Sequence, residues 1–324
     1  MYQDFQLYID GEWAAAKSGA TKQVFDPANE DEIGKISDAG SEDLDRALAA
    51  AEAGFAEWRR TGTWERAAKI RKVADLIRER LDAIATIMSI ETGKPLAEAK
   101  GETNGAADQF EWYSEETKRI YGQLIGSRTH DSRLAVIYQP VGVVAAFSAW
   151  NFPALLPARK IAAALAAGCS VIIKPAGEAP GSCAMIVQAC HDAGIPKGVV
   201  NFVTGNSSMI ARHLISSPVV RKVSVTGSVP VGKEILHLAA EGVKKVSMEL
   251  GGHGPVIVFE DADAEKAAEV CAGTKFRNCG QVCISPTRFY VHEARYEAFA
   301  ARFAQVAKSI KVGRGMDEGT QMGP

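Results

Sequence analysis

Two short segments of this sequence combine residue types that could carry out covalent catalysis. Glu249 lies in the run Met-Glu-Leu-Gly-Gly, and Cys283 ends the run Gly-Gln-Val-Cys further along the chain. A cysteine thiolate is a strong nucleophile, and a thioester formed on it needs a base that delivers water. A carboxylate that follows an apolar stretch and precedes two glycines is well placed to be that base. The pair predicts a nucleophile at Cys283 and a general base at Glu249.

An asparagine further upstream could complete such a site. Asn151 lies in the run Trp-Asn-Phe-Pro, and its amide could donate a hydrogen bond to the oxyanion that forms when a thiolate attacks a carbonyl. A turn residue before Phe-Pro is the structural alternative, and composition alone favours it. The sequence by itself leaves both roles of Asn151 open.

Other chemistries would use the same cysteine. A thiol hydrolase would pair Cys283 with a histidine, and His253 is the candidate because it directly follows the two glycines. A zinc site would use Cys279 together with Cys283, but no CxxC pair or histidine cluster accompanies them. We therefore expect no metal site here.

The three motifs around Asn151, Glu249 and Cys283 resemble, in order and spacing, those of the aldehyde dehydrogenase superfamily, and most closely those of succinate-semialdehyde dehydrogenases. The resemblance implies that Cys283 attacks the aldehyde carbon while the Asn151 amide and the Cys283 backbone N–H bind the oxyanion. It implies that hydride passes to a nicotinamide and that Glu249 then activates water, which releases a free acid. The Gly-Gln-x-Cys context identifies Cys283, and not Cys279 one helical turn earlier, as the nucleophile.

Residues that could bind a dinucleotide follow strand-like apolar runs. Gly227 and Ser228 come after one such run and open a predicted helix, which suits a phosphate at a helix N-terminus. A plain strand–helix turn is the alternative, because the GxGxxG fingerprint is missing. The resemblance implies NAD or NADP as the cofactor and a binding set of Trp150, Asn151, Lys174, Gly177, Gly205, Gly227, Ser228, Gly232 and Leu250.

The choice between NAD and NADP depends on the segment after Lys174. The resemblance implies that Lys174 contacts the adenosine ribose, although a solvated lysine at a strand end is the alternative. Relatives with a strong NAD preference carry Glu three positions later, where this chain has Gly177, followed by Glu178. Without that carboxylate a 2′-phosphate would not be repelled, so the preference stays open.

Two arginines indicate a class of aldehyde. Arg159 lies nine residues after Trp150, and Arg277 lies six before Cys283. A helix-surface charge is the commoner role of an arginine, but a guanidinium can bind a carboxylate through two hydrogen bonds. In succinate-semialdehyde dehydrogenases, arginines at the matching positions hold the carboxylate remote from the aldehyde. We expect oxidation of succinate semialdehyde to succinate, with glutarate semialdehyde or another small aldehyde as the alternative.

The elements that must position these residues change period along the chain. Helical patterns cover residues of about 41–60, 64–90 and 96–120, and Gly93-Lys94-Pro95 separates the last two. Apolar runs typical of buried strands then alternate with helical patterns. The runs cover 141–147, 170–174, 199–203, 222–225 and 244–248, and the helical patterns cover about 157–168, 181–193, 206–215 and 229–241.

This alternation predicts an α/β fold with a doubly wound, parallel, Rossmann-like sheet and an N-terminal helical layer. Ligands of such sheets bind beyond the carboxyl ends of the strands. A second alternation predicts the first part of a second α/β catalytic domain, with strands at 256–259 and 287–291 and helices at about 264–278 and 294–310.

We expect three parts in the chain. Residues 1–124 with 143–252 would form the dinucleotide-binding domain, 125–142 a bridging and oligomerisation hairpin, and 253–324 the N-terminal part of the catalytic domain. Members of the resembled family are typically about half as long again, so we expect a C-terminally truncated chain whose full-length form is a homodimer or homotetramer. The competing hypothesis is a non-catalytic dinucleotide-binding fragment.

Composition excludes several other classes. With 37 basic and 39 acidic residues, the formal net charge of −2 gives no electrostatic case for nucleic acid or a membrane surface. The N-terminus lacks the pattern of a signal peptide, and the six cysteines are scattered instead of framing disulfides. We therefore expect a cytoplasmic enzyme with a small-molecule aldehyde substrate.

Overall fold

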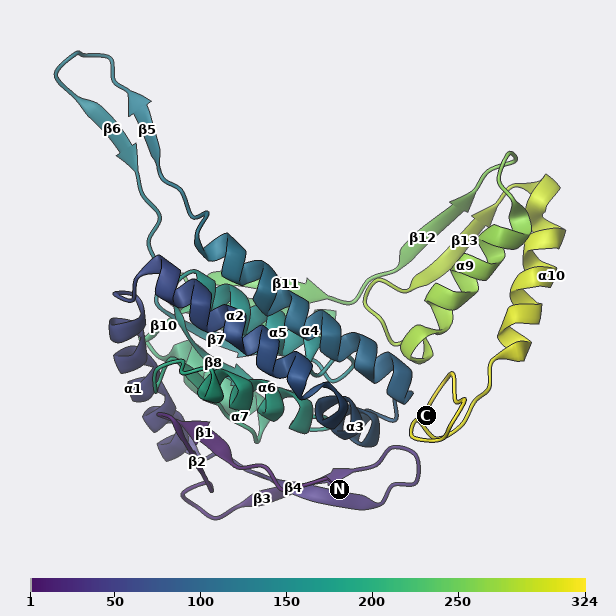
Figure 1. Cartoon of the computed structure of the whole chain (residues 1–324), viewed down its shortest axis with the longest axis horizontal. Helices are drawn as coiled ribbons and strands as arrows, with labels where there is room; N and C mark the ends of the chain where they lie inside the picture. Colours follow the sequence, from purple (N-terminus) through teal and green to yellow (C-terminus); the bar gives the residue numbers. More distant parts are fainter. Residues whose placement is uncertain (1) are drawn as a thin grey trace.

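A seven-stranded sheet organises the computed structural model, which describes residues 2–324 (Figure 1). The order of its strands is β11-β10-β7-β8-β9-β1-β2. Neighbouring strands from β11 to β9 are parallel, whereas β1 and β2 pair antiparallel at one edge. The strands are β1 (Leu7–Ile9), β2 (Glu12–Ala14), β7 (Val143–Phe147), β8 (Ser170–Lys174), β9 (Val200–Phe202), β10 (Val220–Gly227) and β11 (Lys245–Leu250).

Helices cover both faces of this sheet (Figure 1). One face is covered by α1 (Ser41–Trp58), α7 (Ser207–Ser216) and α8 (Val229–Glu241). The other is covered by α5 (Leu155–Ala166) and α6 (Gly181–Asp192), with α2 (Thr63–Glu79), α3 (Leu81–Thr92) and α4 (Leu96–Thr117) packed outside them. The predicted doubly wound α/β fold with a helical N-terminal layer is confirmed.

Burial on both faces explains the apolar strand sequences. In β7, Val144 and Ala146 enter the core beneath α5 and α6, while Val143, Ala145 and Phe147 enter the opposite core. Successive side chains of a strand point to opposite faces, so a strand covered on both sides must be apolar throughout. The continuous run at 141–147 therefore predicted this strand correctly.

Two features of the N-terminal part differ from the prediction. The helical pattern at 64–90 is two helices, because Arg80 leaves the helical region at φ −98° and ψ 16°. Its guanidinium instead pairs with Asp192 at the end of α6, at 2.6 Å. Residues before α1 form strands that the sequence analysis did not predict, namely β1 and β2 and the separate hairpin of β3 (Thr21–Phe25) and β4 (Glu32–Ser37).

A second hairpin extends away from the body of the molecule (Figure 1). It consists of β5 (Gln123–Gly126) and β6 (Arg133–Val136), and the side chains of Leu124 and Leu134 are exposed along it. It overlaps the predicted segment 125–142 but begins two residues earlier, and the bounds and the bridging and oligomerisation roles of that segment stay predictions.

The C-terminal region is a smaller α/β unit to one side (Figure 1). Parallel strands β12 (Gly254–Val258) and β13 (Pro286–Val291) pack against α9 (Ala264–Phe276) and α10 (Glu293–Ser309) around a small apolar core. A short 3₁₀ turn, η1 (Arg277–Gly280), follows α9. The last residues return to the first unit, where Leu96 donates its N–H to the Gly315 carbonyl at 3.0 Å. The predicted division of the chain at residue 253 stays a prediction.

Candidate active site

The residues predicted to bind a dinucleotide gather at one edge of the sheet. Each lies at or after the carboxyl end of one of the five parallel strands, or in the helix that follows: Trp150 and Asn151 after β7, Lys174 and Gly177 at β8, Gly205 after β9, Gly227, Ser228 and Gly232 after β10, and Leu250 at β11. The chain passes from β7 to β8 on one side and returns to β10 on the other, so strand order reverses between β7 and β10. Such a reversal opens the crevice in which these folds bind ligands.

Three observations at this edge fit an anionic ligand. The N-terminus of α8 is exposed and its cap, Ser228, accepts a hydrogen bond from Val231 at 3.5 Å. Lys174 is buried and donates to the Ser207 hydroxyl at 2.5 Å. The Ser148 hydroxyl, just after β7, is buried and has no hydrogen-bond partner among residues 2–324. Helix N-termini and ammonium groups favour phosphate, and an unsatisfied buried hydroxyl is costly unless a ligand satisfies it.

Packing accounts for two of the predicted glycines. A side chain at Gly232 would approach the Leu250 side chain to 2.7 Å, so α8 lies closer to β11 than an alanine would allow. Gly205 has φ +135°, and a side chain there would meet the Asp38 carboxylate at 2.5 Å. Gly177 differs, because the space beside its α-carbon is open.

A cavity of about 660 Å³ brings Cys283 and Glu249 together. Its floor consists of alternate residues of two strands, namely Lys222, Ser224 and Thr226 of β10 and Lys245, Ser247 and Glu249 of β11. Its wall is one face of α5, where Leu156, Arg159, Lys160, Ala163, Ala164 and Ala167 recur at helical spacing. The alternation along the strands and the helical spacing along α5 thus direct polar side chains of separate elements into one cavity.

Positive charge dominates this cavity. Arg159, Lys160, Lys222 and Lys245 line it, and Glu249 is the carboxylate among its lining residues. Burial lowers the pKa of Lys160 to about 8, although the charge of Glu249 opposes the shift. The Lys160 ammonium donates to the Ser224 hydroxyl at 3.1 Å. A negatively charged ligand is therefore favoured in this space.

The segment after Glu249 runs beside the segment that carries Cys283. A side chain on Gly252 would lie 3.4 Å from the Cys283 carbonyl oxygen, and one on Gly254 would lie 3.5 Å from the Ser285 carbonyl oxygen. These glycines allow the two backbones to approach closely. Cys283 is an exposed residue and lines the cavity, as a nucleophile requires.

Cys279 was expected to lie one helical turn before Cys283, but no regular helix joins the two residues. Asn278 and Cys279 adopt left-handed backbone conformations at φ 48° and 57°, and Gly280 follows at φ 75°. The chain therefore reverses here instead of continuing α9. The Cys279 thiol is half-buried, donates to the Gly323 carbonyl at 3.2 Å, and has its pKa raised by burial and by nearby Glu98. It is thus a poorer source of thiolate than an ordinary exposed thiol.

Asn151 lies between the cofactor edge and the Cys283 segment. Its side-chain N–H donates to the Gln281 carbonyl at 2.9 Å, while its side-chain oxygen is buried without a partner within residues 2–324. One N–H of the amide is therefore held on a carbonyl two residues from Cys283. The unpartnered oxygen can only accept a hydrogen bond, so the proposed oxyanion contact would use the second N–H of the same amide, and a donor on a cofactor could use the oxygen.

The two arginines have different surroundings. Arg159 lines the cavity together with Cys283. Arg277 is exposed and its guanidinium lies over the ring of Phe152, with the central carbon 5.1 Å from the ring centroid. Arg277 is not among the residues that line the cavity. Of the two arginines, only Arg159 lines the same cavity as Cys283.

Several polar residues around the site were not predicted from the sequence. Lys160 directly follows Arg159, which could have indicated it, whereas Ser224 comes close to Glu249 only through the pairing of β10 with β11. Lys94 and Glu102 were interpreted only as part of a helix boundary and a helix.

No cluster of three or more His, Cys, Asp or Glu able to hold a metal occurs within residues 2–324. None of the helices in that range has the length and apolar character needed to cross a membrane.

Known proteins match this chain in sequence along almost its whole length. The model of the aldehyde dehydrogenase family matches residues 13–324. Glutarate-semialdehyde dehydrogenase of Pseudomonas putida is 45% identical over 319 residues, which are 98% of this chain and 66% of that protein. Succinate-semialdehyde dehydrogenase (NADP(+)) GabD of Escherichia coli is 44% identical over the same length, with the same coverage.

The fold is shared more closely than the sequence. A crystal structure described as an E. coli NADP-dependent enzyme superposes with a TM-score of 0.98 at 43% identity, covering 99% of this chain and 67% of that one. The chain therefore spans about two thirds of the length of the relatives it matches.

Proposed function

The chain belongs to the aldehyde dehydrogenase family, and we propose that it catalyses NAD(P)-dependent oxidation of a small aldehyde that carries an acidic group, with succinate semialdehyde as the leading substrate. The observation that carries this proposal is the single cavity that joins Cys283, Glu249 and Arg159. Glutarate semialdehyde is the alternative substrate, since relatives named for both compounds are similarly close.

The proposed chemistry uses each residue at a defined step. The Cys283 thiolate attacks the aldehyde carbon, a carbon–sulfur bond forms, and the carbonyl electron pair moves to oxygen. The Asn151 amide and the Cys283 backbone N–H stabilise that oxyanion. A bound nicotinamide would supply the hydride acceptor, and loss of hydride from the same carbon would leave a thioester on Cys283. Glu249 takes a proton from water, the resulting hydroxide attacks the thioester, and the thiolate leaves as the acid is released.

The residues at the cofactor edge fit a dinucleotide. We propose that the N-terminus of α8 with Gly227 and Ser228 binds the pyrophosphate, and that Lys174 contacts the adenosine ribose. A cavity of about 340 Å³ between α7 and α8, lined by Ser207, Val231 and Ile235 among others, can accept the adenine. The open space beside Gly177 leaves room for a 2′-phosphate. Trp150 and Leu250 complete the set at the ends of β7 and β11.

The affinity for NADP should fall as pH rises above about 8. Burial lowers the pKa of Lys174 to about 8, so its ammonium is charged below that pH and neutral above it. A bound phosphate stabilises the charged form and raises the pKa of Lys174 in the complex. The dissociation constant should therefore increase by up to about tenfold per pH unit between the two pKa values.

Titration calorimetry of NADP at pH 6.5 to 9.5 measures this effect. The Lys174→Met variant should bind NADP more weakly at low pH and lose this part of the pH dependence. An unchanged pH profile in that variant would place Lys174 outside the cofactor site.

Replacing Arg159 with alanine should mainly raise KM for succinate semialdehyde. A hydrogen bond to a charged group contributes about 1.5–3 kcal/mol, so a 10- to 150-fold rise is expected. Propanal offers nothing to the guanidinium, so its kinetic constants should scarcely change. Steady-state kinetics with both aldehydes measures the difference.

Arg277→Ala is the matched comparison. We propose Arg277 as a second carboxylate ligand, but its place over Phe152 and outside the cavity predicts a smaller effect than that of Arg159. Equal losses for charged and neutral aldehydes in either variant would indicate a folding defect, and would remove that arginine from the proposal.

A substrate panel tests the proposed function itself. Succinate semialdehyde, glutarate semialdehyde and uncharged aldehydes are each supplied with NAD or with NADP. Formation of the reduced cofactor is followed by its absorbance. The acid-bearing aldehydes should give the highest kcat/KM. Binding of NADP without reduction by any aldehyde would instead favour a dinucleotide-binding protein without turnover.

A further inference from the structure

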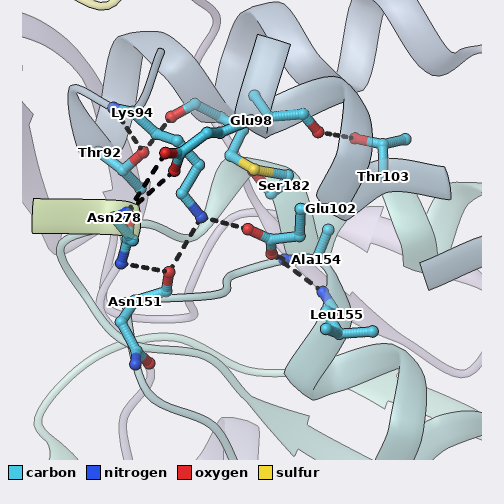
Figure 2. Close-up of polar contacts among 12 residues, drawn as sticks. Thr92, Lys94, Glu98, Glu102, Thr103, Asn151, Ala154, Leu155, Ser182 and Asn278 are labelled. Carbon is cyan, nitrogen blue, oxygen red and sulfur yellow. Dashed lines mark hydrogen bonds and ion pairs between the residues drawn. The ribbon is translucent and has the colours of Figure 1, made fainter. Parts of the chain in front are cut away.

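A buried ion pair lies beside the proposed site and takes no part in the chemistry described above (Figure 2). Lys94 precedes α4 and Glu102 lies in its second turn, and the side chain of each is only 1% exposed. Burying two charges costs more than their attraction returns unless further hydrogen bonds satisfy both groups. The partners of this pair are therefore informative.

Glu102 holds the start of α5. One of its carboxylate oxygens accepts the backbone N–H groups of Ala154 and Leu155, at 2.9 and 3.1 Å, and the other accepts the Lys94 ammonium. A carboxylate at a helix N-terminus satisfies donors that the helix itself cannot. Since α5 carries Arg159 and Lys160, this contact fixes the wall of the cavity.

Lys94 holds the residue proposed to bind the oxyanion. Its ammonium donates to the Asn151 carbonyl oxygen at 3.0 Å and lies 4.4 Å from the centroid of the Phe152 ring. The side-chain amide of that same Asn151 donates to the Gln281 carbonyl. Asn151 is thus fixed by its backbone on one side and by its side chain on the other.

The segment before Cys283 is tied to the same point. The Asn278 side chain donates to the Asn151 carbonyl at 3.2 Å, and the Asn278 backbone N–H donates to Glu98 at 3.1 Å (Figure 2). Glu98 precedes Glu102 by one turn of α4. The first turns of one helix therefore hold both the Asn151 segment and the Asn278 segment.

We propose that Lys94 and Glu102 are positioning residues that keep the Asn151 amide in register with Cys283. This inference rests on the proposed function, because it assigns the pair a role in the thiolate attack. Lys94 acts through the Asn151 carbonyl, and Glu102 satisfies the Lys94 charge while it holds α5. A displacement of a reacting group by about 1 Å can lower a rate about 100-fold, so loss of this link should weaken the first step selectively.

The test removes both charges together. Lys94→Met alone leaves Glu102 charged and unpaired, whereas the combined Lys94→Met, Glu102→Gln protein keeps an acceptor for the start of α5. Its acylation rate, measured as the pre-steady-state burst of reduced cofactor, should fall about 10- to 100-fold. Its dissociation constant for NADP without aldehyde should stay within about twofold. Lys100→Met is the control, because Lys100 lies on the same helix in an exposed ion pair with Asp82, and it should leave both quantities unchanged.

A double-mutant cycle separates positioning from general damage. Asn151→Ala removes the amide but keeps the carbonyl, so the combined Lys94 and Glu102 change should cause no further loss in that background. Equal losses with and without the Asn151 amide would overturn the proposal. A wild-type burst rate in the combined variant would overturn it as well.

A further variant and a cofactor-free measurement complete the design. Asn278→Gly tolerates the left-handed backbone and removes the second donor to the Asn151 carbonyl, so it should slow acylation about 2- to 10-fold. If the combined Lys94 and Glu102 variant does not fold, this variant tests the positioning of Asn151 in its place. Protection of Cys283 from iodoacetamide by succinate semialdehyde, read by peptide mass, reports the thiol adduct without turnover. Absence of protection and of turnover in the unmodified protein contradicts the proposed function, whereas normal protection in the combined variant contradicts only the positioning role.

Discussion

Replacing Cys283 with alanine should abolish aldehyde oxidation, by a factor on the order of 10⁴ or more, because the covalent route loses its nucleophile. Cys283 is an exposed residue lining the cavity that Glu249 and Arg159 also line, so removal of its thiol should leave the fold intact. Formation of reduced cofactor with succinate semialdehyde measures the loss. Binding of NADP should be retained, which distinguishes lost chemistry from lost structure.

Cys279→Ala is the matched control. Its thiol points to the Gly323 carbonyl and has a raised pKa, and its backbone is left-handed. Most of the activity should therefore remain in that variant. Retained turnover in Cys283→Ala, or complete loss of turnover in Cys279→Ala, would show that Cys283 is not the nucleophile.

Replacing Glu249 with glutamine should separate the two halves of the reaction. Glutamine keeps the size of the side chain but cannot accept a proton, so the thioester forms and its hydrolysis stalls. General-base catalysis contributes about 10²- to 10⁴-fold, and steady-state turnover should fall by that amount while the hydride burst remains. Stopped-flow absorbance records both phases in one experiment.

The control for this variant is Glu265→Gln, an exposed change in the first turn of α9 that should alter neither phase. Loss of the burst in Glu249→Gln would mean that Glu249 acts earlier, on the thiol itself. Unimpaired turnover would mean that another group activates the water.

The central strands could be predicted because the sheet is covered on both faces. The run at 170–174 coincides with β8, in which every side chain is buried. A buried side chain must be apolar or must have a hydrogen-bond partner, as the Lys174 ammonium has in Ser207. The hairpin of β3 and β4 could not be found in the same way. In β3 only Val24 is buried, so the strand has neither a continuous apolar run nor a clear alternation.

Some residues of the candidate site could be predicted from local sequence motifs, and others could not. Cys283 and Glu249 lie in local motifs, whereas Lys94 acts on a carbonyl that lies 57 residues away in the sequence. A contact to a backbone oxygen places no demand on the residue type of its partner, so no pattern marks it. Arg277 shows the converse, since its spacing from Cys283 suggested a substrate contact but the reversal of the chain after it leaves the guanidinium on Phe152.

We propose above all that an acyl group is carried on Cys283 during turnover. Mass analysis of peptides from the Glu249→Gln protein, quenched after mixing with succinate semialdehyde and NADP, tests it most directly. We expect a succinyl group on the peptide that carries Cys283, present only when the cofactor is supplied. A burst of reduced cofactor without any acylated Cys283, or with the acyl group on Cys279 instead, would contradict it.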